Sequence, residues 1–284
     1  MSRIISFSAA PYDGWELPVM LESLARCGVT HVEPAYIVGY TEPFDESAFS
    51  QGRACAYRRA LHDAGIGCLA MSSHIDLGMP DSIDIFRNRI DFAAGIGASI
   101  INTNAAVAAH EAQFFRNMET LVAHAEKAGI VIALENPGDG QPSLINTGEQ
   151  GKALVSRIGS PWVGLNFDPG NLPSHDASCD PVAEMRDALP ACAHCHIKNV
   201  RRHEDGWSFH ALGAGGSRDA ECLALLAEVS ALPFAVELPL RMRRGIDAAP
   251  WRRVRRLELA YIEERISDSL TFVRDILPSE VSVA

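Results

Sequence analysis

Short apolar segments alternate with longer amphipathic segments along the 284-residue chain. The apolar segments have the length and composition of buried strands, and the amphipathic ones carry apolar residues at helical spacing. Several amphipathic segments are followed by a glycine, which favours the left-handed conformation that ends a helix. Examples are Gly28, Gly65, Gly97 and Gly129. The pattern predicts a repeated strand–helix unit.

Eight such units are predicted. The expected strands cover residues 4–9, 29–36, 66–74, 98–104, 130–136, 163–167, 193–199 and 234–238. The expected helices cover residues 17–27, 49–64, 81–96, 111–128, 147–158, 181–189, 217–230 and about 251–276. Repeated units of this kind imply a parallel sheet, and eight of them favour a closed (β/α)8 TIM barrel of the α/β class.

A doubly wound open sheet is the main alternative fold. It is disfavoured because no glycine-rich phosphate turn follows the first expected strand. No linker or change of composition divides the chain, so residues 1–284 are expected to form a single domain that ends in the helix at about 251–276.

The late strands show which face is polar. In the strand near residue 133, Ala133 and Glu135 alternate with the bulky Ile132 and Leu134, and the next strand repeats this phase up to Asp168. Bulky residues on one face and small or polar residues on the other predict a barrel whose interior is polar near its mouth.

The chemically distinctive residues stand at the ends of strands five to eight, where (β/α)8 barrels carry their active sites. They are Glu135, Asp168, His196 and Glu237. Buried carboxylates that converge repel one another and are costly without a partner, and a divalent cation offsets both costs. Three carboxylates and one imidazole suit Mn²⁺, Mg²⁺ or Co²⁺ better than a thiolate-type zinc site.

An alternative without metal is open. Glu135 and Glu237 would then form buried salt bridges with Lys198 and nearby arginines, which leaves Asp168 and the histidines unexplained. His194 and His196 lie two apart in a strand and therefore share a face with each other and with Lys198. From spacing alone, either histidine is a candidate ligand.

Four motifs, LEN, NFDPGN, HCHIKN and VELP, together resemble the xylose-isomerase-like TIM barrels of the sugar phosphate isomerase/epimerase superfamily. The resemblance implies that Glu135, Asp168, His196 and Glu237 bind one divalent metal ion, foremost Mn²⁺, with Mg²⁺, Co²⁺ and Zn²⁺ as alternatives. It favours His196 over His194, because the family's ligand commonly precedes an x-Lys-Asp step. His194 is then expected one layer deeper, in support.

The resemblance also implies an activity. Glu135 and Glu237 would be the acid/base pair of an isomerase or epimerase that moves the proton next to a carbonyl through a metal-stabilised enediolate. The substrate would be a sugar, a sugar phosphate or a related polyhydroxy carbonyl compound. A metal-dependent dehydratase of the 3-dehydroshikimate or inosose type, on the same scaffold, is the alternative.

Further residues are expected to bind the substrate. They are His74, Asn104, Asn171, His194, Lys198 and Arg241. Arg241, Arg243 and Arg244 follow Glu237 closely and suit a carboxylate or phosphate, although a solvated loop or a subunit contact is also open. His74 is equally open to a structural role. Arg252, Arg253, Arg255 and Arg256 are expected as an exposed face of the last helix.

Bulk properties limit the partners. A net charge of −11 argues against a nucleic-acid binder, including a DNA-repair enzyme of the endonuclease IV type. Seven cysteines without paired spacing, no signal peptide and no long apolar run fit a cytoplasmic protein with reduced thiols and no membrane span. A small sugar-like or hydroxyacid substrate is expected, and the family resemblance adds a homodimer or homotetramer. A sugar-binding protein without activity is the non-enzymatic alternative.

Overall fold

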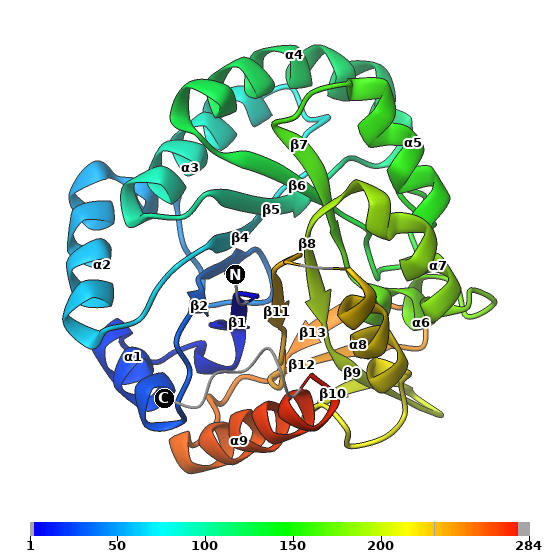
Figure 1. Cartoon of the computed structure of the whole chain (residues 1–284). Helices are drawn as coiled ribbons and strands as arrows, with labels where there is room; N and C mark the ends of the chain where they lie inside the picture. Colours follow the sequence, from blue (N-terminus) through cyan, green and yellow to red (C-terminus); the bar gives the residue numbers. More distant parts are fainter. Residues whose placement is uncertain (1–2, 230, 278–284) are drawn as a thin grey trace.

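The apolar segments of the sequence form a parallel sheet that curves into a barrel with the helices outside it (Figure 1). The computed structural model describes residues 3–229 and 231–277. The strand order around the barrel is β2-β1-β11-β8-β7-β6-β5-β4-β3. These strands are β1 Ile5–Ser8, β2 Val32–Glu33, β3 Ala35–Ile37, β4 Ala70–His74, β5 Ile100–Asn104, β6 Val131–Glu135, β7 Val163–Phe167, β8 Cys192–Ile197 and β11 Phe234–Val236.

The barrel closes through β2 and β3, which are two pieces of one expected strand. Pro34 separates them, because proline has no N–H to donate to a ladder. Before this proline, β2 pairs with β1, and after it β3 pairs with β4. The carbonyl of Pro34 still accepts a 2.8 Å bond from the amide of Ser72. Counting β2 and β3 together confirms the predicted (β/α)8 barrel.

Helices follow the strands and cover the outside of the barrel (Figure 1). They are α1 Leu17–Arg26, α2 Gln51–Ala64, α3 Ser82–Ile96, α4 Glu111–Ala128, α5 Gly148–Ile158, α6 Leu172–His175, α7 Pro181–Ala188, α8 Asp219–Glu228 and α9 Leu259–Ile276. Short 3-10 turns occupy Ala10–Tyr12, Glu46–Phe49, Ala108–His110, Pro169–Asn171 and Leu189–Ala191. None of the helices within residues 3–277 is both long and apolar enough to span a membrane.

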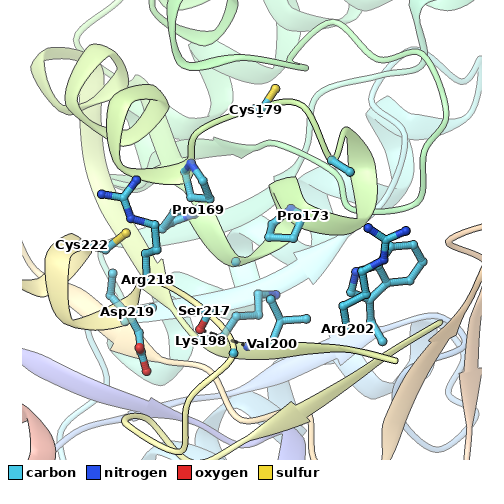
Figure 2. A pocket seen from close by; sticks show the side chains of 16 residues that line it. Pro169, Pro173, Cys179, Lys198, Val200, Arg202, Ser217, Arg218, Asp219 and Cys222 are labelled. Carbon is cyan, nitrogen blue, oxygen red and sulfur yellow. Dashed lines mark hydrogen bonds between the residues drawn. The ribbon is translucent and has the colours of Figure 1, made fainter. Parts of the chain in front are cut away.

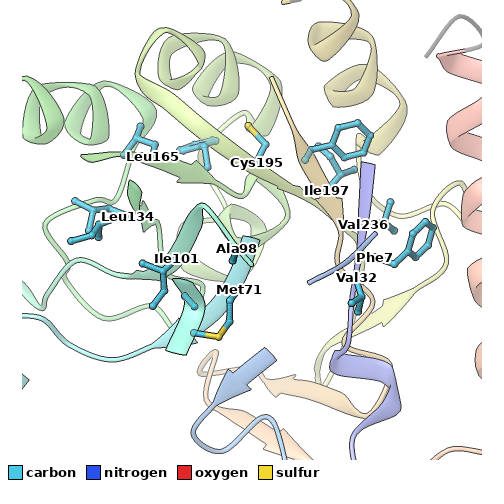
Figure 3. Close-up of a cluster of buried hydrophobic side chains, with 14 of the residues drawn as sticks. Phe7, Val32, Met71, Ala98, Ile101, Leu134, Leu165, Cys195, Ile197 and Val236 are labelled. Atoms are coloured by element: carbon cyan, nitrogen blue, oxygen red, sulfur yellow. The ribbon is translucent and has the colours of Figure 1, made fainter. Parts of the chain in front are cut away.

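The main apolar core lies between the strands and the helices. Leu134, Leu165, Ile197 and Val236, from successive strands, take part in it (Figure 3). Because strand side chains alternate, the neighbours of these residues point to the barrel interior. Those neighbours include Glu135, Asn166 and His196, all buried. The barrel interior is therefore polar near its mouth, as predicted.

A second, antiparallel sheet covers part of the C-terminal end of the barrel, in the order β13-β12-β10-β9. Its strands are β9 Asn199–His203, β10 Gly206–His210, β12 Met242–Gly245 and β13 Pro250–Arg252. They come from the segments that follow β8 and β11. At Gly206 the φ angle is +137°, and a Cβ there would lie 2.0 Å from the carbonyl oxygen of Arg244, so this position requires glycine.

Four sequence predictions are corrected. The last helix begins at Leu259 rather than near residue 251, because residues 250–252 pair with 242–244 as a strand. The arginines predicted on that helix, Arg252, Arg253, Arg255 and Arg256, therefore precede it. Arg252 is not simply solvated but binds Asp13 and Glu42. The third strand begins at residue 70, not 66, and the second is interrupted at Pro34.

Candidate metal centre

Four polar side chains meet at the C-terminal ends of four adjacent barrel strands. Glu135 ends β6, Asp168 follows β7, His196 lies on β8 and Glu237 follows β11. Since these strands are neighbours in the sheet, the side chains converge. One potential ligand atom from each residue lies within 4.8 Å of the others. No member of this quartet is more than 3% exposed.

The imidazole of His196 faces the three carboxylates. Its Nδ1 lies 3.4 Å from an oxygen of Glu135, 3.7 Å from one of Glu237 and 3.9 Å from one of Asp168. This nitrogen is buried and has no hydrogen-bond partner among the described residues. An orphaned imidazole nitrogen surrounded by carboxylate oxygens fits a hard divalent cation, which prefers oxygen ligands and accepts imidazole.

The electrostatics of the quartet also call for a cation. Burial raises the pKa of Asp168 to about 6, helped by repulsion from Glu135 and Glu237 and opposed by Lys198. Burial favours neutral His196, but attraction to the carboxylates, Glu33 first, raises its pKa well above the ordinary value. Burial likewise favours neutral Glu135, yet the imidazoles of His196 and His74 hold its pKa well below the usual range. These opposing shifts have one cause, which is that the converging carboxylates favour positive charge in their midst.

Lys198 supplies part of the positive charge. Its Nζ lies 2.6 Å from Asp168 Oδ2 and also donates to Glu237 Oε2. A Cβ at Gly170 would lie 2.3 Å from Lys198 Cγ, so glycine is needed for the lysine to reach this position. The ion pair expected between Glu237 and Lys198 is therefore present, whereas no ion pair within 4.0 Å joins Glu135 to Lys198. One ammonium cannot balance three converging carboxylates, which leaves room for a divalent ion.

A second set of side chains holds His196 from below. Its Nε2 lies 2.8 Å from Glu33 Oε1. Glu33 in turn accepts hydrogen bonds from Ser72 at 2.8 Å and from Asn102 at 3.1 Å. Glu33, His194 and His196 are also close enough together to qualify as a metal-binding group. Because Nδ1 of His196 faces the quartet, the contact with Glu33 orients this ring for the upper site.

His194 lies deeper, as predicted, and acts through an asparagine. Its Nδ1 lies 2.9 Å from Asn166 Oδ1, and Asn166 Nδ2 donates a 2.6 Å bond to Glu135. Burial lowers the pKa of His194 to about 4, so the ring is neutral. His194 does not line the cavity described below, so the structure gives no support to the expected contact between His194 and substrate.

A cavity of about 270 Å³ opens beside the quartet and is lined by Glu135 and Glu237. Four expected substrate-binding residues also line it, namely His74, Asn104, Asn171 and Lys198. Among the other lining residues, Tyr40 and Gly138 were not expected at the site, whereas Arg244 belongs to the arginine cluster that was expected to suit a carboxylate or phosphate. They come from loops and from the second sheet, where no strand periodicity indicated which way a side chain would point.

Arg241 lies elsewhere, which corrects its expected role. Its guanidinium binds Asp13 at 2.6 Å and the carbonyls of Arg253 and Val254 at 3.0 and 2.6 Å. It does not line the cavity beside the quartet. The buried Arg241 therefore connects the loop after β1 to the segments that flank β12 and β13 of the second sheet.

A second cavity, of about 260 Å³, lies on the other side of Lys198, between the α6–α7 segment, β9 and the start of α8 (Figure 2). No member of the quartet lines it. Its one lining carboxylate, Asp219, already accepts hydrogen bonds from Asn199 and Gly213. Of these two cavities, only the first is lined by residues of the quartet.

Comparison with known proteins points to one family. A family model described as "Xylose isomerase-like TIM barrel" matches residues 21–256. A search of curated protein sequences gave no significant match. Among solved structures, D-psicose 3-epimerase from Clostridium cellulolyticum is 16% identical, with a TM-score of 0.73 over 98% of this chain and 99% of that one.

Two further structures are similar in fold. A xylose isomerase-like TIM barrel protein from Mycobacterium smegmatis, in complex with magnesium, is 19% identical, with a TM-score of 0.70 over 98% of both chains. The 3-keto-D-glucoside 4-epimerase from E. coli is 14% identical, with a TM-score of 0.70 over 96% of this chain and 99% of that one. At these identities the structural likeness establishes the fold.

Proposed function

Because the chain belongs to the xylose isomerase-like TIM barrel family, we propose that it is a divalent-metal-dependent isomerase or epimerase. Its substrate is a sugar, a sugar phosphate or a related polyhydroxy carbonyl compound. The observation that carries this proposal is the buried quartet of Glu135, Asp168, His196 and Glu237 beside a cavity that two of its glutamates line. The sugar epimerases among the structural neighbours support the same substrate class.

Glu135 and Glu237 are the proposed acid/base pair. They stand on β6 and after β11, on either side of Asp168 and His196 in the strand order. A compound in the cavity would therefore meet one carboxyl group from each side. One glutamate takes the proton from the carbon next to the carbonyl, and the other, in its acid form, returns a proton to the opposite face. Return to the opposite face inverts the carbon, which is an epimerisation.

Other residues keep Glu135 in position for this work. Its Oε1 accepts a 3.1 Å bond from Asn171, and its Oε2 accepts the bond from Asn166. His74 Nε2 lies 3.3 Å from the same Oε2. A carboxylate held from several directions loses little orientational freedom when the substrate arrives.

The ion itself is proposed to be Mn²⁺, with Mg²⁺, Co²⁺ and Zn²⁺ as alternatives, held by the four quartet residues. When bound, a divalent cation supplies positive charge that stabilises the negative oxygen developing on the substrate carbonyl. Lys198, which contacts two of the proposed ligands, contributes a fixed positive charge to the same place.

Proton exchange in deuterium oxide tests the proposal. The Mn²⁺-loaded protein is incubated with a panel of neutral and acidic ketoses, and NMR follows deuterium entering the position next to the carbonyl. We expect exchange together with formation of the epimer or isomer. Substitution of either Glu135 or Glu237 by Gln should slow the exchange by about a hundredfold or more.

Two controls make the result specific. Bound metal is quantified in every variant, so that loss of the ion is separated from loss of the proton carrier. Glu149→Gln, an exposed residue on α5, should leave the rate unchanged. The proposal fails if protein with a full complement of metal exchanges no proton of any compound in the panel. Release of water with a new ultraviolet chromophore would instead indicate the dehydratase.

A further inference from the structure

Arg244 brings a buried positive charge to the cavity beside the quartet. It lies on β12 of the second sheet, is 4% exposed, and lines the cavity together with Tyr40, Asn171 and Glu237. The side chain is thus sealed from bulk water but open to whatever occupies the cavity.

The contacts of this guanidinium are all with neutral groups. Nη1 donates to Ser174 Oγ at 2.5 Å, and Nη2 donates to Asn171 Oδ1 at 2.8 Å. Nη2 and Nε also contact the hydroxyl of Tyr40, at 3.1 and 3.3 Å. These contacts leave one hydrogen on Nη1, and the proton of the Tyr40 hydroxyl, without an acceptor in the described part of the chain. Both are available to a ligand.

No ion pair satisfies the charge of Arg244. Within residues 3–229 and 231–277, no carboxylate oxygen lies within 4.0 Å of its guanidinium nitrogens. Arg241, three residues earlier, contrasts with it, because Asp13 and Glu42 both pair with Arg241. An arginine buried without a counterion is costly unless a ligand supplies the negative charge. The carboxylates of Glu237 and Asp168 are committed to Lys198 and to the proposed metal ion.

The chain also makes room for this guanidinium. A Cβ at Gly138 would lie 1.9 Å from Arg244 Nη1, and Gly138 has no positive φ angle that would itself require glycine. The space left by the absent side chain is therefore occupied by Arg244. The ring of Phe209 also packs against the side chain, with its centroid 5.5 Å from the guanidinium carbon. The arginine is fixed in place before any ligand arrives.

We propose that Arg244 and Tyr40 form a subsite for an anionic group of the substrate, either a carboxylate or a phosphate. This inference rests on the proposed function and narrows its substrate class to acidic derivatives of sugars. The reacting carbonyl then lies at the quartet while the acidic group, in the same cavity, contacts the Nη1 hydrogen of Arg244 and the hydroxyl of Tyr40. Charge-assisted hydrogen bonds of this kind are stronger than those to a neutral hydroxyl.

Three probes with the same carbon skeleton test the subsite. D-fructose is neutral, D-fructuronate carries a carboxylate at carbon 6, and D-fructose 6-phosphate carries a phosphate there. Calorimetry measures their dissociation constants on the Mn²⁺-loaded protein. We expect at least one of the two anions to bind about tenfold or more tightly than D-fructose. Which anion gains more distinguishes a sugar acid from a sugar phosphate.

Two substitutions act on the subsite in different ways. Arg244→Gln removes the charge and should abolish the preference for the anion. Gly138→Ala keeps every other side chain but displaces the guanidinium, so it should reduce the preference even if Arg244→Gln folds poorly. Arg243→Gln is the matched control, since Arg243 immediately precedes Arg244 on β12 and does not line the cavity. Mn²⁺ affinity, measured separately, should change little in all three variants.

Equal affinity for all three probes, or an equal loss for all three in Arg244→Gln, would overturn the subsite. The subsite and the proposed isomerase activity can be rejected independently of each other. Tight, Arg244-dependent binding of an anion without proton exchange would reject the isomerase and keep the subsite. Exchange of neutral ketoses, without preference for anions, would keep the isomerase and reject the subsite.

Discussion

At the scale of single residues, His196 uses both of its ring nitrogens. Nδ1 faces the three carboxylates of the quartet, and Nε2 contacts Glu33 at 2.8 Å. A carboxylate behind a metal-binding histidine fixes its tautomer and orientation and makes it a stronger ligand. Hydrogen bonds from Ser72 and Asn102 hold the carboxylate of Glu33 in this orientation.

Replacing Glu33 by Gln should therefore weaken metal binding without touching the quartet. Loss of such an outer carboxylate typically costs about 10- to 100-fold in metal affinity, and we expect a loss in this range for Mn²⁺, measured by calorimetry. Glu22→Gln on the exposed face of α1 provides the control. An unchanged Mn²⁺ affinity in Glu33→Gln would show that the contact with His196 has no part in metal binding.

The sequence predicted Glu135, Asp168 and Glu237 because each stands at the end of a strand in matching phase, whereas the choice of His196 over His194 came from the family resemblance. Phase along a strand is local information, and the barrel then brings the four ends together. The partners of Arg241 and Arg244 were not predictable in this way. Arg241 precedes β12 of the second sheet and Arg244 lies on it, and their side chains point in different directions. Sequence spacing alone does not indicate which of the two points to the cavity.

At the scale of elements, the second sheet is the part that sequence patterning missed. Only β10 shows apolar alternation, with Trp207 and Phe209 on either side of Ser208, whereas β9, β12 and β13 are short and carry arginines, so they lack the signal by which barrel strands are recognised. Residues 250–252 read as the start of a helix until pairing with β12 is considered. This sheet nevertheless supplies Arg244 to the cavity, and Arg241 ties the sheet to the barrel.

The contribution of the Asp13–Arg241 ion pair to stability can be measured directly. Asp13, in the loop after β1, pairs with Arg241 and Arg252, each at 2.6 Å, and its side chain is 2% exposed. Asp13→Asn leaves the buried Arg241 with only Glu42 as a counterion. We expect a loss of about 3 kcal/mol in the free energy of unfolding, from the range known for broken buried pairs. Urea denaturation of the metal-free protein would measure it.

Glu42 supplies the comparison for that experiment. Its side chain is 49% exposed, so its contact with Arg241 is screened by solvent. Glu42→Gln should cost clearly less stability than Asp13→Asn. Equal losses of unfolding free energy in the two variants would mean that burial does not make the Asp13–Arg241 pair more stabilising than the exposed Glu42–Arg241 pair.

At the scale of the whole molecule, the barrel was predictable because its signal repeats. Eight strand–helix units, several of them ended by a glycine, each predict the same βα pattern. Errors at single boundaries therefore do not change the predicted fold. The split of the second strand at Pro34 and the shift of the last helix to residue 259 are such errors. The second sheet has no such repeat, so its strands were not predicted.

Metal binding should stabilise the whole barrel, because its proposed ligands come from four neighbouring strands. An ion that binds only the folded chain, at about a hundred times its dissociation constant, adds about 2.7 kcal/mol to the free energy of unfolding. Urea denaturation with Mn²⁺ and with a chelator would measure this difference. The prediction fails if the denaturation midpoint is the same in both conditions.

The pairing of β1 with β11 has a consequence for how the protein is made. Arg3 Nη1 donates to the carbonyl of Leu232, 229 positions later, and Ile5 pairs with Phe234. At roughly 5 to 20 residues per second of synthesis, the first strand waits roughly 10 to 50 seconds for its neighbour to be translated. Glu237, the last quartet member, emerges at the same late moment. On the ribosome, the nascent chain therefore has neither a closed ring nor all four quartet residues until residue 237 has been synthesised.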